Sequence, residues 1–491
     1  MRVLVLNPPA SDNNYLNRDQ MGGMGQRINF GKDLFAKLLS DFKSKFIRIP
    51  VTQLVYAATI ASQEHEVKVI DSMNEGKNLA VTFKEISLFN PDFLVMPVSS
   101  SGILFEKDVV AAGIKKIVPN CKIITVGETL PYMPHLISPP FDICISGEVE
   151  KCLLEICRNK DLKDIAGISY VKEGKLVTNS NTPFLIGTDL DALPFPKWDL
   201  FPYKKYRYYP LILKEPVATL ISTRGCPYGC HYCSYTENQG LKWRARSPEN
   251  VVEELALDYE KYGFKGVFFR DPLFTLDKQR TMKICDLMIA RGIKLDFALE
   301  TRPELLDEEL MDKLKLAGCS AINMGIEDVN VEVLKNVRIP INTDIIKKTV
   351  NYLEKIGIRT TCFFILGLPG STRETLKKTI DFSLKLNPSH AEYKVATPYP
   401  GTKMYKSALE NKWIIEENYD KLGGYYSVMQ INDELTPKYL EEQSSLAFKN
   451  FYYRPSYFFR EIRKGNWFSK AKILAKFGFE IAREKRQNTK L

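Results

Sequence analysis

Three of the ten cysteines fall within one short stretch of the chain, and their spacing is typical of a metal centre. Cys226, Cys230 and Cys233 follow the pattern C-x3-C-x2-C. Thiolates at this spacing can bind one iron–sulfur cluster, and three ligands for four irons leave one iron open. A zinc site favours a fourth ligand and paired C-x2-C knuckles, and no second knuckle follows. His231 could complete a zinc site only with strain, because it lies between two of the cysteines. The spacing therefore favours an iron–sulfur cluster over zinc or chance clustering.

The loop that carries these cysteines follows a predicted buried strand. Residues 217–222 are apolar and rich in β-forming residues, which is typical of a parallel sheet. Five further strand-like segments follow, with helical patterns between them: 266–269, 295–299, 320–325, 359–366 and 391–395. Six such units predict a partial (βα)6 barrel of the TIM type, and functional side chains in such barrels lie at the carboxyl ends of the strands.

The first 150 residues show the same alternation and predict a second sheet. The strand-like segments are 3–6, 66–70, 93–97, 122–126 and 143–146, with helical segments at 53–63 and 109–118. This order predicts a doubly wound, Rossmann-like α/β domain whose ligands bind at the carboxyl ends of the strands. Small or polar residues occupy those ends, among them Asn7, Ser99, Gly127, Gly147 and Glu148. No G-x-G-x-x-G follows the first strand, which disfavours a nicotinamide site.

Two segments outside the sheets have distinct compositions. Residues 159–211 hold a predicted hairpin and a proline-rich stretch that we expect to connect a domain of residues 1–158 to a core of residues 212–435. Residues 436–491 are helical in pattern, and from residue 448 onward they are basic and aromatic. They could form a cap on the barrel, or a surface helix that contacts anionic lipid. A nucleic-acid surface is a third alternative, which no RRM, KH or C2H2 signature supports.

The composition is ordinary for a globular protein, with 44% hydrophobic and 26% charged residues. A net charge of +10 permits an anionic partner without requiring nucleic acid. The other seven cysteines are scattered through apolar segments, which indicates buried thiols in a reducing compartment. No apolar run is long enough to span a membrane. We therefore expect a cytoplasmic protein, with peripheral membrane contact at most.

The cysteine loop resembles that of the radical S-adenosylmethionine (SAM) superfamily, including the aromatic Tyr232 just before the last cysteine. The resemblance implies a [4Fe-4S] cluster on Cys226, Cys230 and Cys233, whose open iron binds the amino and carboxylate groups of SAM. In that family the reduced cluster cleaves SAM to a 5′-deoxyadenosyl radical, which abstracts hydrogen from a substrate. The resemblance also implies SAM contacts at three strand ends. These are Asp271 for the amino and carboxylate groups, Glu327 for the ribose, and Gly367 for the adenine.

Residues 1–150 resemble the cobalamin-binding domain that precedes many radical SAM cores. The similarity lies in the Asn7-Pro8-Pro9 start, in residues 91–95, and in the closing Gly147-Glu148. The D-x-H-x-x-G signature that supplies a histidine to cobalt is absent, as it often is in the radical SAM branch. The resemblance implies cobalamin bound at the strand ends named above, without a histidine ligand.

These resemblances together imply a cobalamin-dependent radical SAM enzyme that functionalises an unactivated carbon, most simply by methyl transfer. Radical cyclisation or oxidation of a lipid-like or tetrapyrrole-like substrate is an alternative. A methylthiotransferase would carry three further cluster cysteines in an arrangement that this chain lacks. A non-catalytic cobalamin or SAM sensor would not need an open iron. The implied partners are a small, hydrophobic substrate and an electron donor such as ferredoxin or flavodoxin, and no nucleic acid.

Overall fold

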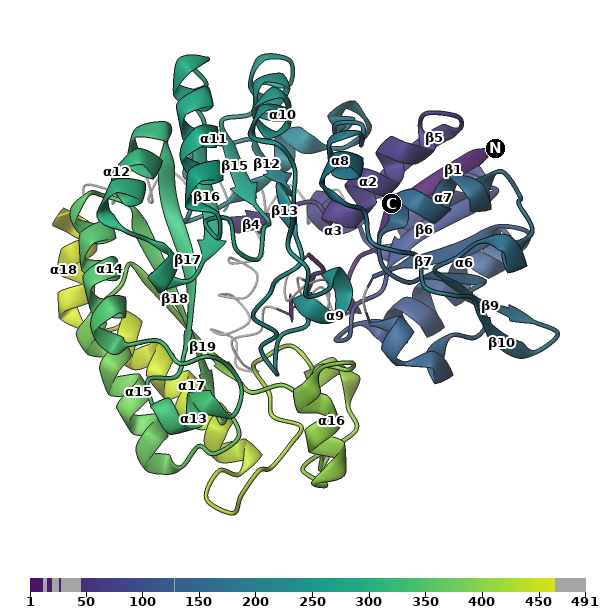
Figure 1. The fold of residues 1–491 in the computed structure, drawn as a ribbon. Helices are drawn as coiled ribbons and strands as arrows, with labels where there is room; N and C mark the ends of the chain where they lie inside the picture. The colour runs from purple at the N-terminus through teal and green to yellow at the C-terminus, as the bar shows by residue number, and fades with distance from the viewer. Residues whose placement is uncertain (12–15, 20–25, 28–45, 128, 464–491) are drawn as a thin grey trace.

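The computed structural model describes residues 1–11, 16–19, 26–27, 46–127 and 129–463. These residues form two α/β halves that lie side by side, each built on its own sheet (Figure 1). Within the described ranges, we find no helix whose length and apolar character would let it cross a membrane.

The first sheet has seven strands in the order β10-β9-β8-β7-β6-β1-β5. Their bounds are β1 (Arg2–Asn7), β5 (Glu66–Asp71), β6 (Phe93–Pro97), β7 (Lys122–Val126), β8 (Ile143–Ile145), β9 (Ile168–Lys172) and β10 (Lys175–Thr178). The five strands predicted in this region are all present, and they pair in parallel. The predicted hairpin is present as β9 and β10. It extends the edge of the sheet, because β9 pairs antiparallel with β8.

Helices cover both faces of the first sheet. On β1, Val3 and Val5 pack in the same core as α2 (Thr52–Ala61) and α7 (Val149–Cys157). The alternate residues Leu4 and Leu6 pack with α4 (Leu79–Phe89) and α6 (Ala112–Ile117). Successive side chains of a strand point to opposite faces, so a strand buried on both faces is apolar throughout. This is why the uninterrupted apolar run at residues 3–6 predicted the strand correctly.

The second sheet has six parallel strands in the order β12-β15-β16-β17-β18-β19. Their bounds are β12 (Val217–Leu220), β15 (Gly266–Phe269), β16 (Asp296–Thr301), β17 (Cys319–Glu327), β18 (Arg359–Leu366) and β19 (His390–Val395). All six predicted strands are confirmed. The intervening helices include α10 (Pro248–Glu260), α11 (Lys278–Ala290), α12 (Glu308–Ala317), α14 (Thr343–Lys355) and α15 (Arg373–Leu386), which lie along the outside of the sheet in Figure 1.

The edge strand β19 is covered by the helix α17 (Pro437–Tyr452). The Tyr452 hydroxyl accepts a hydrogen bond from the Ala391 amide at 3.1 Å and donates one to the Ala391 carbonyl at 3.0 Å. Arg460, on the next helix α18 (Pro455–Arg463), donates to Asn387. An uncovered edge strand would leave its backbone groups unpaired. Residues 437–463 thus act as a cap on the edge of the second sheet. Residues 464–491, which carry much of the basic segment predicted to contact lipid, lie outside the described residues.

The proline-rich connector packs into the core between the two halves. Trp198 is fully buried, and its ring meets Phe264 edge-on at 5.3 Å between centroids. The indole Nε1 donates a 2.8 Å hydrogen bond to Asp258 on α10. Asp258 is itself 1% exposed. Burial raises the pKa of Asp258 well above its usual value, and the neighbouring Glu254 raises it further.

This buried carboxyl group predicts a specific pH dependence of stability. Above about pH 4 an aspartate is ionised in the unfolded chain. In the folded chain the raised pKa keeps Asp258 protonated, so its stabilising contribution is lost as pH rises. Asp258→Asn keeps an acceptor oxygen for Trp198 and removes this loss. We expect its melting temperature to exceed that of the wild type by several degrees at about pH 8, and the difference to vanish near pH 4. The exposed Glu253→Gln on the same helix is the control, and a pH-independent difference would contradict the assignment.

Candidate functional site

The cysteine loop lies between β13 (Thr223–Arg224) and α9 (Tyr235–Gln239), just beyond the carboxyl end of β12. Backbone hydrogen bonds fix it at several points. The Cys226 amide donates to the Gly240 carbonyl at 3.1 Å, and the His231 amide donates to the Val337 carbonyl at 2.8 Å. Gly225 has φ +81°, and a Cβ there would come within 2.1 Å of the Lys242 carbonyl oxygen. The close approach and the positive φ both require glycine at this position.

The three cysteines line an open cavity with about 230 Å³ of space accessible to water. Its other walls come from the carboxyl halves of β16, β17, β18 and β19, as expected for a parallel barrel. The predicted residues Tyr232 and Glu327 line the same cavity. The structure therefore brings together five of the residues that the sequence singled out.

Burial raises the pKa of each of the three thiols above its usual value. The Cys233 thiol is surrounded most completely, and the neighbouring Cys230 raises its pKa further. Among the described residues, no three Cys, His, Asp or Glu side chains converge as ligands of a metal ion. The three sulfurs therefore share a cavity wall without forming a ready-made site for a single ion.

Glu327 ends β17 in an unusual backbone conformation. Its φ is +67°, and the register of β17 against β18 shifts between Gly325 and Glu327. A residue other than glycine in this region is strained, and such strain concentrates at functional sites. The carboxylate faces the guanidinium of Arg338, with 3.4 Å between Oε1 and Nη1. The backbone irregularity thus turns an acidic side chain toward a buried cation.

Arg338 is a cavity residue that the sequence reasoning missed. Its Nη1 donates to the Gly325 carbonyl at 3.1 Å and lies 3.4 Å from the Tyr232 hydroxyl. Its Nε and Nη2 are buried and have no hydrogen-bond partner among the described residues. Arg338 lies in the loop after the short helix α13 (Val331–Lys335), away from any strand end. No pattern in the sequence marks such a position.

Two predicted SAM contacts lie elsewhere in the structure. Asp271 is fully buried, and both of its oxygens accept hydrogen bonds from Ser222. Gly367 adjoins α17, where an added Cβ would come within 2.8 Å of a Leu440 methyl carbon. Pro272 and Leu273, rather than Asp271, line the cavity at the end of β15. The roles expected for Asp271 and Gly367 therefore stay predictions.

Arg270 connects the two halves of the molecule. Its Nε pairs with Asp19 at 2.6 Å, its Nη1 lies 3.4 Å from Glu300, and its Nη2 lies 3.2 Å from the Tyr235 hydroxyl. Asp19 in turn accepts from the Thr52 amide at the start of α2, at 2.8 Å. One guanidinium thus links the cysteine-bearing segment, the end of β16 and, through Asp19, the helix α2 of the first half.

A second, smaller cavity of about 50 Å³ lies between the carboxyl edges of the two sheets. Val98 and Gly127 line it from the first half, and Ile221 and Arg270 line it from the second. Gly127 has φ +122°, and a Cβ there would come within 3.0 Å of the Val98 carbonyl oxygen. Tyr235 lines both cavities and separates them.

Asn7 and Ser99 belong to a buried polar network at the edge of the first sheet. Asn7 donates to Asp71 at 2.8 Å and accepts from Arg18 at 2.9 Å. Arg18 also pairs with Glu106 at 2.6 Å, and Glu106 accepts from the Ser99 amide at 2.8 Å. Glu106 opens a π-helical turn, residues Glu106–Ala111, where the sequence predicted a helix only from residue 109. The network holds both predicted residues in place with their polar groups satisfied by protein.

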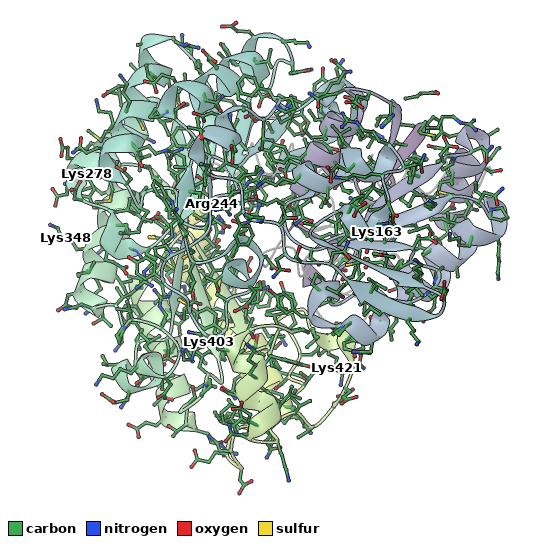
Figure 2. All side chains as sticks on the ribbon, turned by 45° about the vertical axis from the view of Figure 1, so that its right-hand side comes forward. Lys163, Arg244, Lys278, Lys348, Lys403 and Lys421 are labelled. Carbon is green, nitrogen blue, oxygen red and sulfur yellow. The ribbon has the colours of Figure 1, made fainter. Side chains whose placement is uncertain are left out.

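Glu148 joins the two halves through ion pairs. Its Oε1 lies 3.0 Å from Arg224 and 2.6 Å from Arg244, and its Oε2 accepts from the Leu185 amide. Arg244 is labelled in Figure 2, near the middle of the molecule. Burial alone would raise the pKa of Glu148, but Arg224, the Leu185 amide and Arg244 together hold it below its usual value. The adjacent Gly147, with φ +90°, allows the turn that carries this carboxylate to the interface.

This interface carries a stability prediction. Glu148→Gln removes the carboxylate that pairs with Arg244 and leaves Arg224 with Glu150 alone, and the loss of a buried ion pair typically costs about 3 kcal/mol. We expect a reduced free energy of unfolding at neutral pH, measured by urea denaturation. The difference from the wild type should shrink as pH falls through the lowered pKa of Glu148, because its contribution exists only when it is ionised. Glu155→Gln on α7, which affects only a surface pair with Lys160, should have little effect. Equal effects of both substitutions would contradict this role.

Comparisons with known proteins follow this geometry. Residues 220–383 match the family model described as Radical SAM superfamily. The chain is 29% identical over 420 residues to an uncharacterized methyltransferase, PH0819, from Pyrococcus horikoshii, across 84% of this chain and 90% of the relative. It is 24% identical to the anaerobic magnesium-protoporphyrin IX monomethyl ester cyclase of Cereibacter sphaeroides, across 69% of this chain and 56% of that enzyme.

A solved structure with a similar fold is that of TsrM from Kitasatospora setae, a radical S-adenosylmethionine methyltransferase with cobalamin and a [4Fe-4S] cluster bound. The TM-score is 0.63 at 17% identity, and the match covers 84% of this chain and 75% of that one. At this identity the likeness concerns the fold. It includes both halves of the chain and thus extends beyond residues 220–383.

Proposed function

We propose, on the premise that residues 220–383 match the Radical SAM superfamily model, that the chain is a cobalamin-dependent radical SAM enzyme that transfers a methyl group to an unactivated carbon. One observation carries the proposal. The three cysteines, Glu327 and Arg338 line one cavity at the strand ends of the second sheet, and Tyr235 separates it from a cavity at the strand ends of the first.

The donor set on the cavity wall fits an iron–sulfur cluster. Cys226, Cys230 and Cys233 would hold it, and the absence of convergence on one point suits a cluster in which each thiolate binds a different iron. When bound, the cluster supplies the electron that cleaves SAM. Arg338 has buried donors without partners, which suit the carboxylate of SAM, while Glu327 suits its ribose hydroxyls. Tyr232 would complete this wall.

The edge of the first sheet fits part of a large planar cofactor. The backbone at Gly127 is accessible from the second cavity, because this residue has no side chain. A Cβ at this position would be crowded against Val98. Cobalamin, when bound, supplies the centre that carries a methyl group. We propose that residues 1–158 form its Rossmann-like domain, joined by residues 159–211 to a (βα)6 barrel of residues 212–435 and a helical region of residues 436–491. TsrM, which binds both cofactors within a similar fold, supports this architecture.

The residues between the two cavities would protect the reaction. Tyr235, Arg270 and Glu300 fill the space between the cysteine wall and the first half with protein groups instead of water. Exclusion of water prevents the loss of reactive species to solvent. An external donor such as ferredoxin or flavodoxin would supply the electron that the cluster needs.

Product analysis tests this function directly. The full-length protein, reconstituted anaerobically with cluster and hydroxocobalamin, is incubated with SAM and titanium(III) citrate. We expect two products by mass spectrometry: 5′-deoxyadenosine from SAM cleavage, and S-adenosylhomocysteine from the SAM that loses its methyl group. Formation of 5′-deoxyadenosine alone would favour the alternative of radical cyclisation or oxidation, and the Cereibacter relative is named a cyclase. Formation of neither product would refute the radical SAM assignment.

A further inference from the structure

A buried lysine lies in the main cavity, on the edge strand farthest from the cysteine loop. Lys394 is on β19, at one edge of the second sheet, whereas the cysteine loop follows β12 at the other edge. The Nζ atom is buried, and it has no hydrogen-bond partner among the described residues. It lies 3.3 Å from a carboxylate oxygen of Glu392 and 3.7 Å from the centroid of the Tyr425 ring.

A buried ammonium group requires strong acceptors. One ion-pair contact leaves most of its three donors unused, and buried polar groups in native proteins are almost always hydrogen-bonded. Tyr399 lines the same cavity and is 2% exposed; its buried hydroxyl lies beside Thr397 but makes no hydrogen bond of good geometry within the described ranges, because the Thr397 hydroxyl donates to the Val395 carbonyl. Both groups can donate, so a complementary ligand must present acceptor oxygens.

The wall around these donors is apolar. Phe363 and Ile365 of β18 and Val395 of β19 line the cavity beside Lys394. Ile365 is the register partner of Lys394, and Phe363 is that of Glu392. A ligand at this position would place an apolar body along β18 while a polar group reaches the end of β19.

The contacts proposed for SAM involve other residues of this cavity. The donors that suit its carboxylate belong to Arg338, which adjoins Tyr232 and Glu327. Lys394 and Tyr399 therefore remain for a second molecule.

We propose that the substrate of this enzyme is an amphipathic acid, whose carboxylate binds Lys394 and Tyr399 and whose apolar body lies along Phe363 and Ile365. This substrate class rests on the proposed function, because it assigns the second ligand of the radical SAM cavity. Glu392 acts as the competitor of the substrate carboxylate for Lys394. The Glu392 carboxylate balances the charge of Lys394 when no substrate is bound, and this competition lowers the affinity for the substrate.

The competition between Glu392 and the ligand distinguishes a binding site from a purely structural ion pair, because only a binding site would show the preferences described next. The probes are 4-phenylbutanoate, 4-phenylbutan-1-ol and 4-phenylbutylamine, titrated by calorimetry into the full-length holoenzyme with SAM bound. We expect the acid to bind at least about tenfold more tightly than the alcohol and the amine.

Lys394→Met should remove this preference. Glu392→Gln should strengthen acid binding about threefold or more, and Tyr399→Phe should weaken it to a similar degree. Lys403→Met, at an exposed position labelled in Figure 2, is the matched control and should change nothing.

Several results would overturn the proposal: equal or tighter binding of the amine or the alcohol, weaker acid binding by Glu392→Gln, or no binding of any probe by the wild type. If Lys394→Met does not fold, the opposite effects expected for Glu392→Gln and Tyr399→Phe still decide the question.

Iron content and SAM affinity of the wild type are measured alongside. If these fail, the proposed function fails; the probes are then titrated into the same full-length protein without SAM, and the preference can still be measured because Lys394 is no cluster ligand.

Discussion

Replacement of any one of Cys226, Cys230 and Cys233 by alanine should abolish cluster assembly and all SAM cleavage. Each thiolate would bind one iron, and water, a weaker ligand than a thiolate, cannot replace it. The measurements are iron and sulfide counts after anaerobic reconstitution, and 5′-deoxyadenosine by chromatography. We expect at least a thousandfold loss of SAM cleavage, an effect typical of removing an essential catalytic group.

The control for these variants is Cys285→Ala. Cys285 is 1% exposed on α11 and lies outside the cavity lining, so its loss should lower stability by about 1 kcal/mol while leaving the cluster intact. A Cys226, Cys230 or Cys233 variant that still holds four irons per chain would sink the ligand assignment.

Arg338→Met should raise the dissociation constant of SAM about 100-fold, because it removes the donors assigned to the carboxylate and leaves Glu327 without its partner. Equilibrium dialysis with radiolabelled SAM measures this. The iron content should stay at the wild-type value, since Arg338 holds no cluster ligand position. Lys335→Met, on the exposed face of α13, is the matched control. SAM affinity unchanged by Arg338→Met would refute the role of this residue.

The sequence predicted the strands well because buried parallel strands leave a simple signal. Most of the eleven parallel strands are apolar runs between helical segments, and their order along the chain determines which ends carry the site. The position of the cysteine loop after β12 and of Glu327 at the end of β17 could be predicted for the same reason.

The contacts of individual side chains could not be predicted in this way. Asn7, Ser99 and Glu148 stand at strand ends, as expected, but their polar groups bind other protein groups that are distant in the chain. Arg338 lies on a loop, where no periodicity marks a residue that folds back over the cavity. Lys394 and Glu392 alternate along β19, and a strand with two charged residues gives no sign in the sequence that they line a cavity.

We propose that one chain holds a cluster and a corrinoid at the facing edges of its two sheets, and native mass spectrometry can detect both at once. The full-length protein is reconstituted anaerobically with iron, sulfide and hydroxocobalamin, freed of excess reagents, and measured intact. We expect a mass increase that corresponds to one [4Fe-4S] cluster and one cobalamin per chain, with the cluster mass missing from Cys230→Ala and the corrinoid mass retained. A wild-type chain that carries the cluster and no corrinoid, or neither, would contradict it.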